Sequence, residues 1–324
     1  MALTLVCLEV SVRLLNLNAK IEYLFDRPMS EPDGLLGYKN RPNVQVRATK
    51  KKDGQLLFDV RYSTDEHGRR STPVQGGKRT RRFMLFFGCS FTFGEGVGDD
   101  ETLPSRVSKL APDYMVYNYG VGGYGPQYMP MKLASSELPN ELLGGGDGIF
   151  VYTFIDHHIP RVIGWMSIME YGSSLPYYQL DEKGQLARRG SFMSGRPVVT
   201  DLYLAMWKSQ LVRYVTSLLR LPRIRDQDVM LTAKLIEESR NIFRERFQSE
   251  RFYVLFYPHD ANFTAGRLIP YLQKAGIKYL DYSNLTDPDM IDKIPQDPHP
   301  SARSYRAVAA KLARDLGVSK EGRE

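Results

Sequence analysis

The 324-residue sequence predicts an α/β fold built on a five-stranded parallel sheet. From Arg81 onward, short apolar runs alternate with longer stretches of helical periodicity, which is the pattern of strand–helix–strand units. The runs are apolar almost throughout, as strands are when helices cover both faces of a sheet. The five predicted strands are FMLFFG at 83–88, MVYNYG at 115–120, GIFVYTF at 148–154, FYVLFYP at 252–258 and IKYLDYS at 277–283.

Helices are predicted between and after these strands. They are expected at 101–110, 126–137, 229–249, 262–275 and 301–315. The stretch 160–227 is too long for a simple connection, and it contains the amphipathic segment LYLAMWKSQLVRYVTSLLRL at 202–221. We therefore expect a helical insertion, a lid or subdomain, within a main domain that spans 81–324.

Residues 26–80 are predicted to form a small β-rich, basic extension ahead of the main domain. Turn residues are frequent there, and KKDG between VQVRA at 44–48 and LLFDVRYS at 56–63 is typical of a hairpin turn. Eleven Lys or Arg stand against four Asp or Glu between Val44 and Arg82, and this surplus accounts for the whole net charge of +7. Such a stretch is either a solvated face or a surface for an anionic partner such as a membrane.

Residues 1–25 are predicted to hold an apolar N-terminal helix or a truncated membrane anchor. The segment MALTLVCLEVSVRLLNL is interrupted by Glu9 and Arg13, and it is shorter than the roughly twenty apolar residues of a membrane span. It lacks the basic start and cleavage site of a signal peptide. It is either a helix packed on the domain or on a membrane surface, or the end of a span whose upstream part is missing. The second alternative is favoured because the apolar run stops at Asn16 and Asn18.

The composition also excludes several classes of protein. Cys7 and Cys89 are the only cysteines, so a disulfide framework is not expected. The five histidines form no zinc pattern, and no metal site is predicted. No nucleic-acid-binding motif accompanies the basic stretch, so no nucleic-acid partner is predicted.

The stretch GCSFTFG at 88–94 places Ser90 directly after the first predicted strand. Active sites of open α/β sheets lie at the carboxyl ends of strands, so Ser90 is a candidate nucleophile as well as a candidate helix cap. A serine hydroxyl needs an adjacent base to become nucleophilic. The candidate base is His299, in QDPHPSARSYRAVAAKLARDL near the end of the chain, and Asp297 is placed to orient its imidazole.

Oxyanion-hole donors are predicted in VYNYGVGGYGPQ, the loop after the second strand. Its glycines let the backbone approach a substrate closely, and backbone N–H groups with an Asn amide are suitable donors. The candidates are Asn118, Gly123 and the backbone N–H of Ser90. The third strand ends in YTFIDHHIPR, which makes Asp156, His157 and His158 candidates to line a substrate pocket.

Together these motifs resemble those of the SGNH (GDSL-like) hydrolase family over roughly residues 81–324, without the insertion. GCSFTFG resembles the first block, which supplies the serine nucleophile and one backbone oxyanion donor. NYGVGGYG resembles the second block, with Gly123 as the match to its oxyanion glycine. DPHPS resembles the last block, which supplies Asp297 and His299. The resemblance implies a flavodoxin-like three-layer α/β/α sandwich, the SGNH hydrolase fold, that works without a cofactor.

The sequence departs from the family pattern at three places. Cys89 stands where the family has Asp before the serine. Asp297 and His299 are separated by one residue, whereas two are common in the family. Ile155 stands where the third block has an Asn donor. Either one of the two histidines after Asp156 replaces that donor, or the hole relies on the remaining donors alone.

The sequence therefore predicts a serine esterase that deacylates an O-acyl ester, on an envelope carbohydrate or a lipid, through an acyl-enzyme. Two alternatives stay open: an acyltransferase on the same triad, and a non-catalytic carbohydrate-binding protein on the same fold, which Ile155 favours. LEVSVRLL and LGYKNRPN resemble bacterial members that carry a membrane anchor. This resemblance implies a membrane-associated protein with its catalytic domain on the extracytoplasmic side, and a cytoplasmic location stays open as the alternative.

Overall fold

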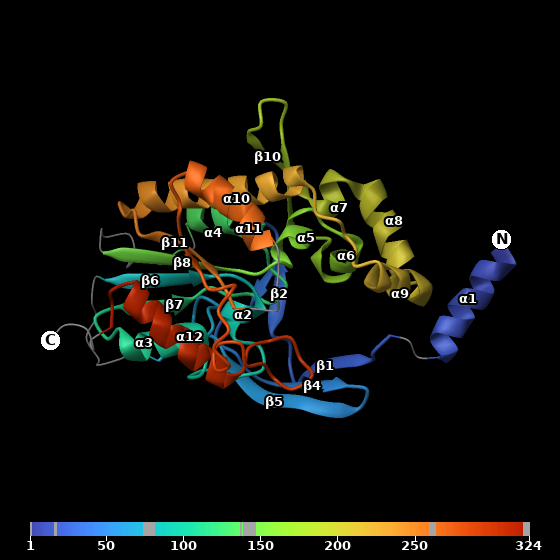
Figure 1. The fold of residues 1–324 in the computed structure, drawn as a ribbon, viewed down its shortest axis with the longest axis horizontal. Helices are drawn as coiled ribbons and strands as arrows, with labels where there is room; N and C mark the ends of the chain where they lie inside the picture. The colour runs from blue at the N-terminus through green and yellow to red at the C-terminus, as the bar shows by residue number, and fades with distance from the viewer. Residues whose placement is uncertain are drawn as a thin grey trace.

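A five-stranded parallel sheet forms the centre of the molecule in the computed structural model (Figure 1), which describes residues 2–15, 18–73, 82–136, 138, 147–258 and 264–319. The strands lie in the order β12-β11-β8-β6-β7. Numbered along the chain this order is 2-1-3-4-5, which is the flavodoxin-like order. The predicted fold class is therefore confirmed. The strands are β6 (Phe83–Phe87), β7 (Met115–Asn118), β8 (Gly148–Phe154), β11 (Phe252–Phe256) and β12 (Lys278–Asp281).

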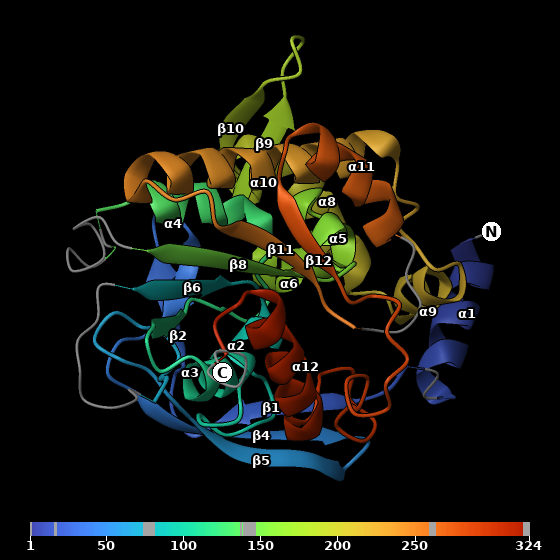
Figure 2. The same cartoon turned by 60° about the vertical axis from the view of Figure 1, so that its left-hand side comes forward.

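Helices cover both faces of the sheet, which gives the predicted three layers (Figure 2). Successive side chains of a strand point to opposite faces, so Leu85 and Phe87 lie in one core while Met84 and Phe86 lie in the other. The first face carries α4 (Met129–Ala134), α10 (Asp226–Phe247) and α11 (Thr264–Lys274), and the second carries α3 (Leu103–Leu110) and α12 (Ala302–Asp315). These helices match the predicted ones. Residue 137, at the end of the predicted helix 126–137, and residues 262–263, at the start of the predicted helix 262–275, lie outside the described residues.

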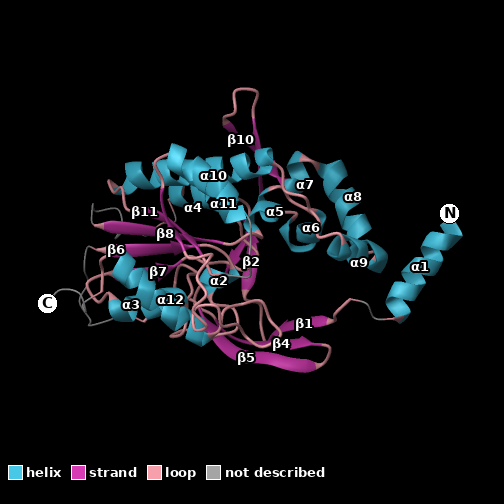
Figure 3. Ribbon diagram, in the orientation of Figure 1, coloured by secondary structure: helices cyan, strands magenta, loops and turns pink. Residues whose placement is uncertain are grey.

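The insertion contains a β-hairpin as well as helices (Figure 3). The predicted helix at 202–221 is two helices, because Ser209 has extended backbone and its side chain accepts a hydrogen bond from the N–H of Val212 as an N-cap. Its elements are α5 (His158–Val162), α6 (Met166–Gly172), β9 (Pro176–Leu180), β10 (Leu186–Ser191), α7 (Phe192–Gly195), α8 (Pro197–Trp207) and α9 (Gln210–Leu218).

The N-terminal extension forms two small antiparallel sheets. One has the order β1-β4-β5, from β1 (Ile21–Phe25), β4 (Gln45–Lys52) and β5 (Gln55–Ser63), and the other pairs β2 (Ser30–Asp33) with β3 (Gly37–Asn40). The predicted hairpin at KKDG is present between β4 and β5. Asp53 and Gly54 have φ angles of 49° and 83°, and left-handed backbone at both central positions is the mark of a type I′ turn.

Buried cations attach this extension to the main domain. Arg70 is 1% exposed, its Nε donates to Asp99 at 2.6 Å, and its guanidinium lies 4.3 Å and 4.6 Å from the ring centroids of Tyr62 and Phe93. Arg69 is also buried. Part of the basic stretch is therefore structural and not a solvated face. The predicted boundary between the extension and the main domain, at 80 and 81, lies outside the described residues.

The first helix, α1 (Ala2–Leu14), lies beside α9 (Figures 1 and 2). The carboxylate of Glu9 accepts hydrogen bonds from the N–H groups of Gln210 and Leu211 and from the hydroxyl of Ser209. These contacts, led by that of Leu211, lower the pKa of Glu9 to about 2. No helix in the described part of the chain has the length and apolar character that crossing a membrane requires.

Candidate active site

The turn after the first strand of the sheet holds Ser90 at the start of a short helix, α2 (Ser90–Phe93). Gly88 has a φ angle of 155°, and a Cβ atom on it would lie 2.2 Å from Oγ1 of Thr92, so only glycine fits this turn. The hydroxyl of Tyr305, on α12, donates to the carbonyl of Phe91 at 2.9 Å. The last helix of the domain therefore fixes the short helix that carries the serine.

The structure brings together all three residues of the predicted triad. Oγ of Ser90 lies 2.8 Å from Nε2 of His299, and Nδ1 of His299 lies 2.5 Å from Oδ1 of Asp297. With the proton on Nδ1, the imidazole donates to Asp297 and accepts from the Ser90 hydroxyl, which is the arrangement that a general base needs. The three residues are nearly buried, with exposed fractions of the whole residue of 5%, 8% and 5% for Ser90, His299 and Asp297.

A tight loop before α12 explains how the short Asp–His spacing still gives this geometry. The N–H of Ile294 donates to the carbonyl of His299 at 3.0 Å, and the N–H of Asp297 donates to the carbonyl of Ile294 at 2.9 Å. Oδ1 of Asp297 then accepts from the backbone N–H of His299, at 2.9 Å, as well as from its ring. One intervening residue is sufficient because the same oxygen fixes both the backbone and the ring.

Lys50, from β4 of the extension, reaches the far side of the triad. Its ammonium lies 2.7 Å from Oδ2 of Asp297 and 2.9 Å from Oε1 of Glu95. Burial alone would raise the pKa of Asp297, but hydrogen bonds from His299 and Lys50 outweigh it and hold this pKa well below its ordinary value. Burial lowers the pKa of Lys50, and Glu95 and Asp297 reverse this and raise it. The pair is therefore ionised at neutral pH.

Glu95, Asp297 and His299 also place three potential metal-ligand atoms within 4.8 Å of one another. Both ring nitrogens of His299 are already engaged, one with Asp297 and the other with Ser90. The ammonium of Lys50 contacts both carboxylates. A cation would have to displace Lys50, so we assign these carboxylates to the lysine.

The backbone donors predicted for an oxyanion hole lie at the same cavity as the triad. Ser90 and Gly123 both line this cavity, and neither backbone N–H has a hydrogen-bond partner among the described residues. Gly123 has a φ angle of 81°, and a Cβ atom on it would lie 2.6 Å from the hydroxyl of Tyr38. That hydroxyl donates to the carbonyl of Gly122 at 2.7 Å, so the extension also holds the glycine loop in place.

The predicted role of Asn118 as an oxyanion donor is wrong. Its side chain is fully buried, its Nδ2 donates to the carbonyl of Thr92 at 2.9 Å, and its Oδ1 accepts from the N–H of Gly120 at 2.9 Å. The amide is used to tie the glycine loop to α2. Asn118 therefore shapes the site without facing it.

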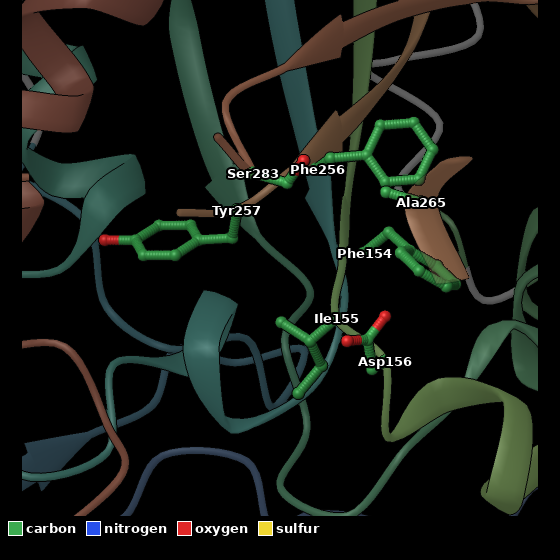
Figure 4. A pocket seen from close by; sticks show the side chains of 7 residues that line it. All are labelled: Phe154, Ile155, Asp156, Phe256, Tyr257, Ala265 and Ser283. Atoms are coloured by element: carbon green, nitrogen blue, oxygen red, sulfur yellow. The ribbon is translucent and has the colours of Figure 1, made fainter. Parts of the chain in front are cut away.

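Asp156, His157 and His158, which directly follow the third strand, are not among the residues that line the cavity, so they do not line it as predicted. Ile155 and Asp156 border a separate small pocket beside the end of β11 (Figure 4). His158 is fully buried, with Nδ1 2.5 Å from the hydroxyl of Tyr152, and burial holds its pKa well below the ordinary value. His157 is exposed at the N-cap of α5. Neither ring replaces the missing Asn donor.

The cavity beside Ser90 has a volume of about 880 Å³, which is within the range of pockets for small molecules. The extension supplies about half of the residues that line it, and the others come from the region of α2, the glycine loop, the insertion and the loop that holds His299. The lining residues include Tyr23, Phe25, Met29, Ser30, Glu31, Tyr38, Ser90, Glu95, Gly122, Gly123, Arg161, Tyr171, Ser174 and His299.

Comparison with known proteins finds solved structures, whereas no family model and no curated protein matches the chain. An acetyl xylan esterase from Butyrivibrio proteoclasticus is 14% identical, with a TM-score of 0.39 over 83% of this chain and 68% of its own. A lipolytic protein of the G-D-S-L family from Veillonella parvula is 14% identical, with a TM-score of 0.40 over 72% and 97%. The SGNH-hydrolase family esterase AlinE4 is 11% identical, with a TM-score of 0.36 over 75% and 97%.

The structural neighbours are SGNH and G-D-S-L esterases and lipolytic proteins. The identities and TM-scores are low, so the roles of the site residues rest on the contacts within this chain.

The sequence did not predict three residues that lie at the site, namely Lys50, Tyr38 and Arg161. Lys50 belongs to a run of three lysines, and nothing in that run distinguishes the buried one. Tyr38 lies in LGYKNRPN, and the resemblance of that stretch to membrane-anchored proteins does not indicate a contact with the site. The position of Arg161 could have indicated a site residue, since it is the first Lys or Arg after the strand end YTFIDHHIP. Ligands of α/β sheets bind at the carboxyl ends of the strands, so a cation there is a candidate to bind an anionic ligand.

Proposed function

We propose that the protein is a serine esterase that removes an acyl group from an O-acyl ester, with Ser90 as nucleophile, His299 as general base and Asp297 orienting the imidazole. The observation that carries the proposal is the hydrogen-bond chain from Ser90 through His299 to Asp297 at the wall of a cavity large enough for a substrate. The cavity is essential to the argument, because without it the same three residues would form a buried hydrogen-bond network that no substrate could reach.

In the first half of the reaction, Oγ of Ser90 attacks the acyl carbon while Nε2 of His299 takes the hydroxyl proton. The negative charge moves to the carbonyl oxygen, where the free N–H groups of Ser90 and Gly123 are available to stabilise it. His299 then returns the proton to the alcohol oxygen as the ester bond breaks. Asp297 stays ionised throughout, with Lys50 as its counter-ion.

In the second half, a water molecule attacks the acyl-enzyme and His299 takes one of its protons. The carboxylic acid leaves as Oγ of Ser90 regains a proton from His299. An acceptor alcohol in place of the water gives acyl transfer by the same steps, so the two outcomes share one site. Hydrolysis is the form we propose, on an ester of an envelope carbohydrate or lipid.

We further propose that the chain is held at a bacterial membrane, with the site on the extracytoplasmic side. This part of the proposal is supported by exposed apolar side chains on α1, on its neighbour α9 and on α8, which contacts α9. They include Leu5, Leu14, Leu202 and Leu218. Apolar area on a helix, together with nearby basic residues, favours binding to an anionic lipid surface.

The test of the esterase proposal uses a panel of short-chain acyl esters and a serine-reactive fluorophosphonate. Ser90→Ala and His299→Ala should each lower kcat by about three orders of magnitude or more, while Ser30→Ala, a serine of the same cavity wall, should keep activity. The fluorophosphonate should label wild type on the peptide that contains Ser90. A wild type inert to both esters and label would instead support the non-catalytic carbohydrate-binding alternative.

A further inference from the structure

The cavity carries one charged side chain that the proposed reaction does not use. Of the Asp, Glu, Lys and Arg residues that line the cavity, Glu95 pairs with Lys50 at 2.9 Å and Glu31 pairs with Arg41 at 3.5 Å. Arg161 lines it too, and no carboxylate in the described part of the chain pairs with it. Among the described residues that line the cavity, Arg161 is therefore the charged side chain without an opposite charge beside it.

Arg161 is held firmly beside the catalytic residues. It is 8% exposed, and its Nη1 donates to the carbonyl of Tyr124 at 2.9 Å. Its side chain lies against those of Cys89, next to the nucleophile, and Tyr171, another cavity residue. Its Nε is buried and has no hydrogen-bond partner. The groups that the guanidinium does contact are the carbonyl of Tyr124, the thiol of Cys89 and the hydroxyl of Tyr171, and none of these is a carboxylate.

A buried charge without a partner is rare in proteins, because removing a charge from water is costly unless an opposite charge compensates it. An arginine remains protonated at every pH at which an esterase is assayed. The transient oxyanion of the reaction would compensate this charge only for an instant in each cycle. The guanidinium of Arg161 is charged throughout the cycle, so it is matched by a substrate that carries an anionic group throughout the cycle.

We propose that Arg161 binds a carboxylate of the substrate, so that the preferred substrate is an acyl ester of an acidic compound. The inference rests on the proposed esterase function and names its substrate class. A planar guanidinium matches a carboxylate through two parallel hydrogen bonds. The cavity of about 880 Å³ has room for a sugar-sized group beside the ester. The carboxylate belongs either to the alcohol part, as in an acylated uronate, or to the acyl part, as in a succinyl ester.

Two matched pairs of esters test the proposal and separate these sources. The first pair is acetylated glucuronate and acetylated glucose, and the second is the succinyl and butanoyl esters of one neutral alcohol. In at least one pair, wild type should show a kcat/KM at least tenfold higher for the acidic ester. In Arg161→Gln the ratio of kcat/KM for the acidic ester to kcat/KM for the neutral ester should fall about tenfold or more. In Arg161→Lys, which keeps the charge but lacks the two parallel N–H donors of a guanidinium, this ratio should fall less. Arg188→Gln, on the exposed hairpin, is the control and should keep the wild-type ratio.

A binding measurement keeps the inference testable if the esterase proposal fails. Calorimetry on Ser90→Ala should show tighter binding of an oligouronate than of the matching neutral oligosaccharide, or of succinate than of butanamide, with the difference lost in Ser90→Ala/Arg161→Gln. Equal kcat/KM values within both ester pairs in wild type would overturn the proposal. So would a drop in Arg161→Gln that is equal for acidic and neutral esters, because that result places Arg161 at the oxyanion. Absence of turnover with every ester contradicts the esterase function only, and the calorimetry then decides.

Discussion

The ammonium of Lys50 lies 2.7 Å from the carboxylate of Asp297, so a strand of the N-terminal extension contacts the residue that orients the proposed catalytic base. Both side chains are nearly enclosed, with exposed fractions of 12% for Lys50 and 1% for Asp297. Asp297 thus has two cationic or polar partners, His299 on one oxygen and Lys50 on the other. The extension is therefore part of the candidate active site.

Replacing Lys50 with Gln should lower kcat more than it changes KM. The change removes one charged hydrogen bond from Asp297, worth about 1.5–3 kcal/mol, which corresponds to a roughly tenfold to hundredfold loss in rate. Lys51→Gln, the next residue of the same strand, is the matched control and should behave as wild type. Steady-state kinetics on a short acyl ester measure the effect. Equal kcat values in Lys50→Gln and Lys51→Gln would contradict a role of Lys50 in the reaction.

The pH dependence of stability should report on Asp297. Its pKa in the folded chain lies below the ordinary value of 3.8. Such a group stabilises the fold above its unfolded pKa, and this contribution is lost as the pH falls through the folded pKa. We expect the free energy of unfolding to decline as the pH is lowered below about 4, and to decline less steeply in Asp297→Asn. Urea titrations at pH 3, 4 and 6 measure both slopes, and parallel curves would contradict the prediction.

Two adjacent glycines offer a matched test of the oxyanion loop. A Cβ atom on Gly123 would lie 2.6 Å from the hydroxyl of Tyr38, and its φ angle is 81°, whereas a Cβ atom on Gly122 meets nothing within 4 Å. Gly123→Ala should therefore displace the N–H donor and lower kcat by about a hundredfold to a thousandfold. Gly122→Ala should leave kcat within about threefold of wild type. A larger loss at Gly122 than at Gly123 would be incompatible with the assigned donor.

The two histidines after the third strand should behave as structural or surface residues. His157 is exposed and outside the cavity, so His157→Ala should leave kcat/KM unchanged. His158 is buried against Tyr152, so His158→Ala should lower the free energy of unfolding by about 2–4 kcal/mol through the cavity and the unpaired hydroxyl. Denaturant titration and kinetics separate the two effects. A selective loss of kcat in His157→Ala would instead support the hypothesis that His157 is an oxyanion donor.

Membrane association is tested with the whole chain, because the extension carries Lys50 and cannot be removed without breaking the site. Leu5, Leu8 and Leu14 on α1 are exposed. The protein should float with anionic vesicles, and the triple replacement of these residues by Ser should abolish flotation. Leu56→Ser, at an exposed position of the β4–β5 hairpin, is the control and should still float. Flotation of the triple variant at the wild-type level would exclude α1 as the contact.

The sequence was informative where local pattern and tertiary structure agree. The strands of the parallel sheet are apolar on both faces, so each appears as an unbroken apolar run such as GIFVYTF at 148–154. The hairpin of β9 and β10 was missed because LARRGS at 186–191 is half-exposed and polar, with no alternation. The break at Ser209 was missed because it contains neither Gly nor Pro, only a serine that caps the second helix.

The same contrast holds for the site. Ser90, Gly123, Asp297 and His299 stand in short motifs, since turn geometry and neighbouring residues must be local to place them. Lys50 acts through a contact between distant segments, and no local pattern encodes which lysine of a run is buried. Asn118 was assigned the wrong role because an amide after a strand suits a donor to substrate as well as a link between two loops.

The order of the site residues along the chain has a consequence for protein synthesis. Lys50 and Ser90 leave the ribosome early, whereas Asp297 and His299 follow only after the whole parallel sheet. A serine without its base is an ordinary alcohol. A nascent chain therefore carries an unreactive hydroxyl, and under the proposed function the cell is not exposed to hydrolase activity until translation has passed the last loop and the two halves of the site have met.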